Sequence, residues 1–366
     1  MLRDGLKNSI KKYRAEMREL TKSILDIALA RQKVAELIAR AKESSGARIE
    51  NQEVEKRLAA EMASYAKKIG VDGDLGRRVV AELIEYSKIA QRKKIFLGPI
   101  KKYLEYTGIR TVSIYGAGRM GGWFASYFSE AGLSVTAYDE NRRLASKWER
   151  ETGIRFAKSF DQATSADLHI VAVPIRETPK LVRKLAKIKA SQVRILEISS
   201  VKNGVRKLLA QGSLPESVWL CSIHPLFGSG ANPFGENCII EIGKKSEFAS
   251  HVFPHYRIFK MSVDEHDRLM AFVLTLPHLH ALTFADIVGG GKIPANIHSP
   301  SFDHMLELSK RVLSENERIY YEIQATNPYA RDAISLTARS VAKLQRLVRD
   351  ESSFERFFRQ TRRELV

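Results

Sequence analysis

The first hundred residues carry an apolar pattern with the period of a helix. Between residues 6 and 41 apolar side chains recur at alternating spacings of four and three, the heptad pattern of helices that pair along a seam. The segments "SSGA" and "GVDGDLG" divide this region into three predicted helices, at 1–44, 50–69 and 75–94. Gly98 and Pro99 then indicate a linker at 98–108.

Short β-branched runs replace this pattern from residue 111 onward. They alternate with helical stretches and read "TVSIYG", "SVTAYD", "DLHIVAVP", "VRILEIS", "VWLCSIH" and "CIIEIG". Such alternation is typical of a parallel α/β sheet. After about residue 262 the pattern is helical again, interrupted only at "GGGKIP". The sequence therefore predicts a multidomain chain: an all-α three-helix domain at 1–97, an α/β Rossmann domain at 109–262 and an all-α domain at 263–366.

Polar side chains interrupt the apolar faces of the first three helices. Arg31 occupies a seam position, and Lys42, eleven residues later, faces the same way. A buried arginine without an anion is costly, so a carboxylate or an anionic ligand must pair with it. The other two helices place further polar groups on their packing faces: Asn51, Glu55, Ser87 and Gln91. Together the six predict a lined pocket, and the alternative is an ion pair of Glu55 with Arg31 or Lys42.

A glycine-rich loop follows the first predicted strand. "GAGRMGG" places Gly116, Gly118 and Gly121 in the G-x-G-x-x-G spacing at the start of a helix, and Asp139 ends the next strand. The glycines allow a tight turn, close approach of a pyrophosphate and helix–strand packing, and the helix N-terminus attracts phosphates. Asp139 would accept a ribose hydroxyl and repel a 2′-phosphate. We therefore expect NAD as the cofactor, although nearby Arg142 and Arg143 keep NADP open.

Histidines supply the candidate acid–base chemistry. His224 follows a predicted strand, at the edge where open α/β sheets bind ligands, and "ISSVKNG" ends another strand. Oxidation of a hydroxyl by NAD requires a group that takes the hydroxyl proton, and the pKa of histidine suits that task. His224 is the best candidate. His280 and His304 are weaker ones, which we expect to be structural.

The composition limits the classes of partner and compartment. The net charge of +18 favours anionic partners, but no zinc-finger spacing or basic tail supports nucleic acid. Cys221 and Cys238 are the only cysteines, so no disulfide framework is implied. The N-terminus lacks a signal-like apolar segment, and no uninterrupted apolar run approaches about 18 residues. We expect a cytoplasmic protein that binds neither nucleic acid nor membrane and requires no metal.

Residues 109 to about 350 resemble prephenate dehydrogenases. "GAGRMGG", "VAVPI", "SSVKNG", "HPLFG", "DEHD", "LPHLHA" and "SPSF" occur in that family's order. The resemblance implies that His224 is the catalytic base, that Ser200 and His278 line the substrate site, and that the glycine-loop residues Arg119 and Met120 bind the cofactor. Asp303 stands where the family commonly has a carboxylate-binding arginine. Arg311, two turns later, is the candidate replacement, and a different substrate is the alternative.

Residues 5 to 95 resemble the all-helical chorismate mutases. The resemblance implies that Arg14 and Arg31 bind the two carboxylates of chorismate and that Lys42 and Gln91 contact its ether oxygen. Glu55 then holds the ring hydroxyl, with Asn51 and Ser87 as further contacts. Many relatives carry an arginine at the position of Val54. Arg14 lies more than about 20 Å along the helix from Arg31, so in this fold a partner chain supplies it.

These resemblances predict a bifunctional enzyme of tyrosine biosynthesis that acts as chorismate mutase and NAD-dependent prephenate dehydrogenase. The C-terminal helices are expected to form a homodimer. Two alternatives remain open at this point. One is another NAD-dependent dehydrogenase, of arogenate or a small hydroxy acid, with a helical domain that only dimerises. The other is an NAD-sensing DNA-binding regulator, which would bind duplex in a salt-sensitive way and turn nothing over.

Overall fold

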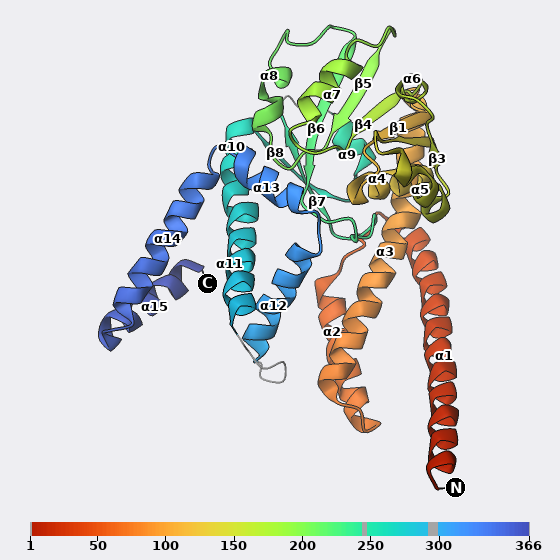
Figure 1. Cartoon of the computed structure of the whole chain (residues 1–366). Coiled ribbons are helices and arrows are strands. Elements are labelled where there is room, and N and C mark those ends of the chain that lie inside the picture. Colours follow the sequence, from red (N-terminus) through yellow and green to blue (C-terminus); the bar gives the residue numbers. More distant parts are fainter. Residues whose placement is uncertain (1, 244–246, 292–298, 366) are drawn as a thin grey trace.

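The computed structural model describes residues 2–243, 247–291 and 299–365 (Figure 1). Along the chain come three long helices, a sheet flanked by helices, and a second group of helices. Figure 1 shows the sheet at the top, with the two helical parts extending below it on opposite sides. The predicted fold class, with an α/β domain between two helical domains, is confirmed.

Three helices form the N-terminal part: α1 Leu2–Ser45, α2 Gln52–Lys68 and α3 Gly73–Tyr106. Asn51 caps α2, because its side chain accepts a hydrogen bond from the backbone N–H of Val54, and Asp72 caps α3 in the same way. Small residues let α2 and α3 pack closely. A Cβ on Gly76 would lie 2.7 Å from the Cβ of Ala66, so a larger side chain there would push the two helices apart.

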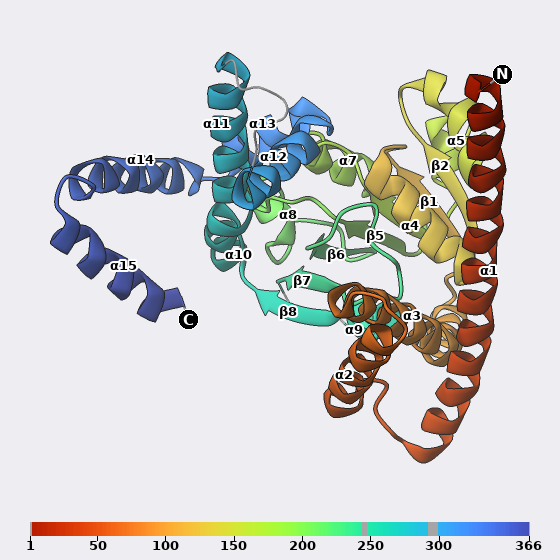
Figure 2. The same cartoon turned by 90° about the horizontal axis from the view of Figure 1, so that it is seen from below.

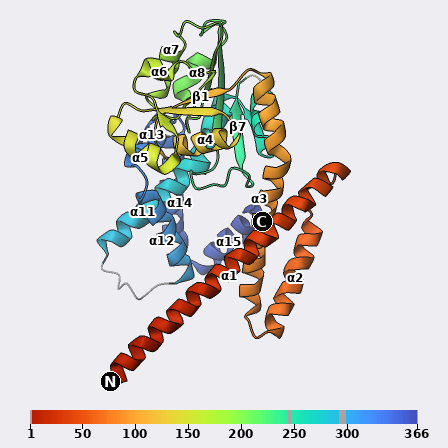
Figure 3. The ribbon, with the colours of Figure 1, turned by 90° about the vertical axis from the view of Figure 1, so that its right-hand side faces the viewer.

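The heptad seam of α1 is exposed within the protomer. Its members, between 43% and 69% exposed, are Ile10, Tyr13, Met17, Leu20, Ile24, Ile27, Val34 and Ile38. The C-terminal half of α1 instead packs on α3 through another face, where Ala35 and Ala39 are buried. Figure 3 shows α1 crossing α3 obliquely, with its N-terminal half projecting beyond the other helices. Apart from Arg31, whose Nε contacts the carbonyl of Leu83 on α3, no seam position is covered by an element of the described chain.

The expected linker at 98–108 is wrong as a break in the helix. α3 continues through Gly98 and Pro99 to Tyr106. Pro99 lacks the N–H that would bond the carbonyl of Ile95, which ordinarily ends or kinks a helix. Beyond it, however, Ile100 and Leu104 are 0% and 1% exposed in the core of the α/β domain. Their burial stabilises a continuation that the local sequence disfavours.

Eight strands form one sheet in the described residues, in the order β3-β2-β1-β4-β5-β6-β7-β8. Their bounds are β1 Thr111–Tyr115, β2 Ser134–Tyr138, β3 Arg155–Phe156, β4 Leu168–Val171, β5 Val193–Glu197, β6 Val218–Pro225, β7 Cys238–Ile242 and β8 Arg257–Met261. The six predicted strands are present. The short β3 and the half-exposed β8 were not predicted, and β7 is antiparallel to β6, so the sheet is mixed rather than parallel.

Helices cover both faces of this sheet. They are α4 Arg119–Glu130, η1 Arg142–Leu144, α5 Ala145–Thr152, α6 Phe160–Ala163, α7 Thr178–Leu185, η2 Asn203–Val205, α8 Arg206–Leu209 and α9 Glu247–Val252. One core combines α4, α9 and the end of α3 on one face, with Phe124 and Phe253 fully buried. The other core lies under α7. The strand order from β3 to β6 is that of dinucleotide-binding sheets.

The C-terminal part is helical: α10 Val263–Met270, η3 Ala271–Thr275, α11 Leu276–Gly290, α12 Pro300–Leu313, α13 Glu317–Thr326, α14 Ala330–Leu347 and α15 Glu351–Leu365. The run Val263–Gly290 is long and apolar enough to cross a membrane by length and composition alone, and 17% of its apolar window is buried. This feature was not predicted from the sequence. The predicted interruption at 289–294 ends outside the described residues.

An ionic cluster joins α3 to the α/β domain. The guanidinium of Arg92, 2% exposed, lies 2.6 Å from a carboxylate oxygen of Glu50 and 3.1 Å from one of Glu236. Lys88 lies 3.2 Å from the same Glu236 carboxylate and 3.5 Å from that of Glu55. Glu236 belongs to the segment between β6 and β7. The cluster therefore ties the helical domain to the loop that follows His224.

Candidate active sites

The glycine loop has the geometry of a nucleotide-binding turn. Gly116 has φ +104°, and a Cβ there would lie 2.3 Å from the carbonyl oxygen of Ala172. A Cβ on Gly121 would lie 2.0 Å from the carbonyl oxygen of Gly116. At Gly118, by contrast, a Cβ would meet no atom within 4 Å. The turn itself thus requires Gly116 and Gly121, whereas Gly118 leaves the backbone open at the N-terminus of α4.

Asp139 lies beside this loop. Its carboxylate accepts hydrogen bonds from the backbone N–H of Ala117 at 2.9 Å and of Asn141 at 2.8 Å. This places an anion between the glycine loop and the end of β2, where a ribose would lie. Arg142 is directed elsewhere, because its guanidinium bonds the carbonyl of Ala157 and lies over the ring of Phe156. The site therefore fits a dinucleotide without a 2′-phosphate.

His224 ends β6 at the carboxyl edge of the sheet. Its Nδ1 lies 2.9 Å from Nε2 of His266, whose Nδ1 lies 2.8 Å from a carboxylate oxygen of Asp267. His266 and Asp267 come from α10 and are fully buried. Burial, with the charges of His266 and Lys202, holds the pKa of His224 well below its ordinary value of 6.5. His224 is therefore neutral near pH 7 and can accept a proton.

A buried ion pair lies next to this chain of side chains. Nζ of Lys202 lies 2.7 Å from a carboxylate oxygen of Glu197 and donates to the carbonyl of Ile223 at 2.8 Å. Both charged side chains are fully buried. Glu197 also accepts hydrogen bonds from the hydroxyls of Ser199 and Ser222. The pair fixes the ends of β5 and β6 against each other, directly before His224.

The two predicted cations of the helical domain contact backbone carbonyls. Nε of Arg31 lies 3.5 Å from the carbonyl of Leu83, and Lys42 donates to the carbonyl of Ile49. In the described part of the chain no carboxylate pairs with either cation. Gln91 is 6% exposed, and its Oε1 has no hydrogen-bond partner among the described residues. Cations and a buried amide without anions of their own are the groups that an anionic ligand requires.

Three family models match successive parts of the chain. They are "Chorismate mutase type II" at residues 13–92, "Prephenate dehydrogenase, nucleotide-binding domain" at 124–237 and "Prephenate dehydrogenase, dimerization domain" at 262–362. The chain therefore combines a domain of the chorismate mutase type II family with the nucleotide-binding and dimerisation domains of the prephenate dehydrogenase family. Both resemblances found in the sequence are thereby confirmed, as is the expectation of an enzyme with a nucleotide-binding and a dimerisation domain.

Curated relatives support the fused arrangement. The T-protein of Haemophilus influenzae is 22% identical over 86% of this chain and 81% of its own length. A "Probable arogenate/prephenate dehydrogenase" of Methanocaldococcus jannaschii is 23% identical over 66% of this chain. The latter match spans 57% of that protein. The chain thus covers little more than half of one relative and most of another.

Solved structures show the same fold for the dehydrogenase part. A prephenate dehydrogenase from A. aeolicus, in complex with hydroxyphenyl propionate and NAD+, has a TM-score of 0.58 and 20% identity, and covers 70% of this chain and 98% of that one. The Synechocystis arogenate dehydrogenase has a TM-score of 0.51 and 15% identity, and covers 69% and 98%. At these identities the likeness establishes the fold.

Of the predicted mutase residues, Arg31 and Ser87 lie together, because both contact the carbonyl of Leu83. Ser87 and Gln91 are buried on α3, next to the half-buried Arg31 of α1. Glu55 does not neutralise Arg31 or Lys42, because its carboxylate faces Lys88 and the backbone N–H of Asn51. Lys88 was not predicted. Arg14 lies about 26 Å along the continuous α1 from Arg31, so the protomer does not bring these two together.

The predicted substrate residues of the dehydrogenase lie after β5, on α11 and on α12. Ser200 follows β5, next to β6 and His224. Nδ1 of His278 has no hydrogen-bond partner in the described chain, its ring meets that of Tyr320 at 4.6 Å, and burial lowers its pKa. Arg311 is exposed and pairs with Glu307 on the surface of α12. Its predicted role on a substrate carboxylate stays a prediction.

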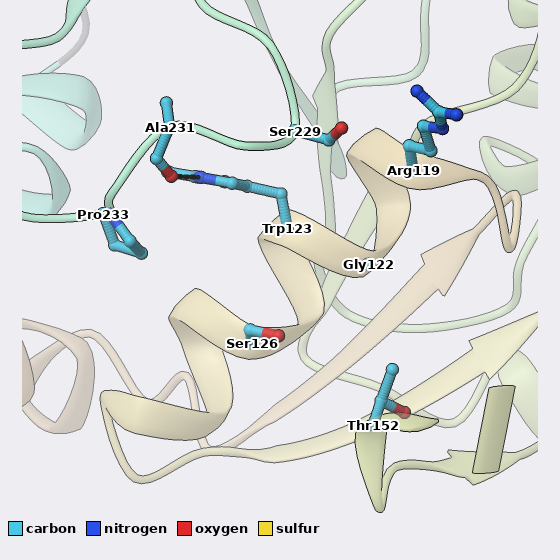
Figure 4. Close-up of a pocket in the computed structure, with 8 residues that line it drawn as sticks. All are labelled: Arg119, Gly122, Trp123, Ser126, Thr152, Ser229, Ala231 and Pro233. Carbon is cyan, nitrogen blue, oxygen red and sulfur yellow. Dashed lines mark hydrogen bonds between the residues drawn. The ribbon is translucent and has the colours of Figure 1, made fainter. Parts of the chain in front are cut away.

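An open pocket of about 390 Å³ lies on α4 beyond the glycine loop (Figure 4). Its walls are Arg119, Gly122, Trp123, Ser126, Thr152, Ser229, Ala231 and Pro233. The indole N–H of Trp123 donates to the carbonyl of Ala231 at 2.8 Å. Arg119, predicted to bind the cofactor, is the member it shares with the predicted sites, and it forms an ion pair with Glu315. His224 does not line this pocket.

Sequence reasoning missed three groups near the reacting centres. The motif "DEHD" was noted, but nothing in the sequence placed His266 and Asp267 against His224, because α10 follows β6 by two strands. Tyr320 carries no motif. Lys202 lies in the quoted segment "ISSVKNG", but its pairing with Glu197 was not predicted. The available signal was Glu197 itself, a charged residue inside an otherwise apolar strand.

Proposed function

We propose that the protein converts chorismate to prephenate in its mutase domain and then oxidises and decarboxylates prephenate to 4-hydroxyphenylpyruvate with NAD, two steps towards tyrosine. One observation carries the proposal. A single chain presents two cations, Arg31 and Lys42, that have no carboxylate partner among the described residues, and a neutral buried histidine, His224, at the edge of a dinucleotide-binding sheet. The first set suits a dicarboxylate, and the second suits proton removal from a hydroxyl.

The mutase step requires binding and electrostatics. The rearrangement involves no nucleophile and no proton transfer, so the pocket holds the compact conformer and stabilises negative charge on the breaking ether oxygen. Arg31 binds one carboxylate, while Lys42 and the amide of Gln91 meet the ether oxygen. Glu55 holds the ring hydroxyl, with Asn51 and Ser87 beside it.

The dehydrogenase step requires a base next to the cofactor. Gly116, Gly118 and Gly121 seat the pyrophosphate of NAD, with Arg119 and Met120 at the start of α4, and Asp139 accepts from the ribose hydroxyls. When bound, NAD supplies the oxidant for the C4 carbon of prephenate. His224 takes the proton of the C4 hydroxyl, while Ser200, His278 and Arg311 hold the substrate. Loss of the ring carboxylate as carbon dioxide makes the product aromatic.

The working assembly is a homodimer in the cytoplasm, without nucleic-acid or membrane partners. Two apolar surfaces are available for a second copy: the seam of α1 and the helices α11, α14 and α15 of the dimerisation domain. Pairing along α1 brings Arg14 of one chain to the pocket of the other and covers the seam. Pairing of the C-terminal helices covers the apolar face of α11.

The test is a set of assays on the purified chain and on Arg31→Ala. We expect chorismate loss without NAD, NADH formation from chorismate with NAD, and NADH formation from prephenate. In Arg31→Ala the first activity should fall at least about 100-fold, since a charge-assisted contact to the transition state is lost, while oxidation of prephenate persists. Lys33→Ala removes an exposed cation two residues away and should change neither activity.

Each other outcome points to one of the alternatives. Oxidation of arogenate in preference to prephenate would move the substrate to the amino analogue and give Asp303 a role on its ammonium group. Persistence of chorismate with normal prephenate oxidation would make the helical domain a dimerisation module. Salt-sensitive duplex binding without any turnover would support the regulator instead.

A further inference from the structure

Three side chains form a continuous hydrogen-bonded chain behind the proposed base. His224 contacts His266, and His266 contacts Asp267, at 2.9 Å and 2.8 Å. The geometry points to His266 and Asp267 as positioning residues that hold His224 with Nδ1 protonated and Nε2 free. When His224 takes a proton from the substrate, His266 accepts the proton that is displaced from Nδ1 of His224. This inference rests on the proposed function, in which His224 is the base of the dehydrogenase.

The direction of the chain follows from its buried end. Asp267 accepts from the backbone N–H groups of Lys202 and Asn203, both at 2.8 Å, so its carboxylate acts as an acceptor. Nδ1 of His266 must therefore donate to it, which leaves Nε2 of neutral His266 as an acceptor. Nδ1 of His224 then donates to His266. The remaining nitrogen of His224, Nε2, carries the lone pair that a base needs.

The same chain gives the substrate proton a place to go. As the O–H bond of the C4 hydroxyl breaks, Nε2 of His224 gains that proton, and Nδ1 of His224 passes its own proton to Nε2 of His266. The electron pair leaving C4 goes to NAD, the oxidant of the proposed reaction. The pair of histidines ends with one additional proton, located on His266 next to the carboxylate of Asp267.

The charged groups around the pair favour this location. Burial lowers the pKa of His266, but the hydrogen bond and charge of Asp267 act to raise it, and Glu197 acts in the same sense. Lys202 lowers the pKa of both histidines. No carboxylate of the described residues contacts His224, so a positive charge left on it would be unpaired in a buried site. Transfer to His266 places that charge beside an anion.

Two substitutions separate the two roles of His266. His266→Ala removes both the acceptor and the proton site, and kcat for prephenate oxidation should fall about 100-fold or more. In His266→Gln, the side-chain oxygen still accepts from Nδ1 of His224 but cannot take its proton. We expect this variant to recover about tenfold over His266→Ala, with KM for prephenate and the affinity for NAD within about twofold of the parent.

The pH profile supplies a readout that a merely structural role would not move. In the parent, uptake of a proton by the histidine pair causes the fall of kcat at acid pH. Without His266 only His224 remains, and burial and the charge of Lys202 still lower its pKa. The acid limb should therefore move to lower pH in both variants, while mutase activity reports that the chain is folded.

His169→Gln is the matched control. His169 is also buried in the sheet, bonds the hydroxyl of Tyr115 and has its pKa lowered to about 4 by burial, but it contacts none of the site residues. The acid limb of the pH profile and kcat of His169→Gln should match those of the parent. If both His266 variants keep parental kcat and an unmoved acid limb, the inference is overturned. If the parent itself does not oxidise prephenate, the proposed function fails independently of His266.

Discussion

At the level of single residues, a buried ion pair supports the proposed dehydrogenase site. Lys202 and Glu197 are both inaccessible to solvent, and two serine hydroxyls complete the shell of the carboxylate. Such a pair adds little stability compared with apolar side chains of the same size, yet removal of one partner leaves an uncompensated charge. Its value here is geometric, because it fixes the strand end that carries His224.

Lys202→Met tests this account. The variant should lose about 3–5 kcal/mol of the free energy of unfolding, because the carboxylate of Glu197 is left buried without its cation. Equilibrium denaturation in urea measures the loss. The double variant Lys202→Met with Glu197→Gln should recover most of it. A double variant as unstable as the single one would contradict an explanation based on the unpaired charge.

At the scale of elements, α3 belongs to two domains at once. Its middle turns carry Ser87 and Gln91 of the proposed mutase site, and its last turns carry Ile100 and Leu104 into the core beneath the sheet. Local sequence favours a break at Gly98 and Pro99. Burial of the later apolar residues outweighs that preference, so the helix is a rigid connection rather than a linker.

Ile100→Ala should therefore destabilise the dehydrogenase part. We expect a loss of about 2–5 kcal/mol, as for other fully buried large-to-small changes. Thermal unfolding monitored through prephenate oxidation measures this effect. Tyr106→Ala, at a side chain 89% exposed on the same helix, is the control and should change stability by less than about 0.5 kcal/mol. Equal effects of the two substitutions would indicate that residues 98–108 are a linker and not a rigid connection.

At the scale of the whole molecule, the surfaces available for self-association lie far apart. Figure 2 shows α1 along one side and α14 and α15 at the opposite end, with the sheet between them. In the proposed homodimer, a second chain paired along α1 accounts for both the exposed seam of α1 and the distance of Arg14 from Arg31. The mutase site is then complete only in the assembly, whereas the glycine loop and His224 lie in one chain.

Co-expression of Arg14→Ala with Arg31→Ala tests this arrangement. Each variant alone should lack mutase activity. In a mixed dimer one of the two sites combines an intact Arg31 from one chain with an intact Arg14 from its partner, so a statistical mixture should regain about a quarter of parental activity. Two affinity tags isolate the mixed dimer, in which about half of the activity is expected. Mixed dimers as inactive as either variant would exclude a shared site.

Elements that are marked by a local sequence pattern could be predicted from the sequence alone. Helical period in residues 1–97, the strand, glycine loop, helix and acid from Thr111 to Asp139, and the position of His224 after a strand all lie within short windows. Arg31 and Lys42 were visible for the same reason, as cations on apolar faces. Such patterns are fixed by backbone geometry and by the separation of apolar from polar surface.

Contacts between distant segments could be identified only from the folded chain. His224 and His266 are 42 residues apart, and Arg92 and Glu236 are 144 apart, so no local pattern connects them. The continuation of α3 past Pro99 and the antiparallel β7 likewise depend on what the rest of the fold buries. The side chains behind the proposed base could therefore not be predicted from the sequence, whereas the position of His224 after a strand could.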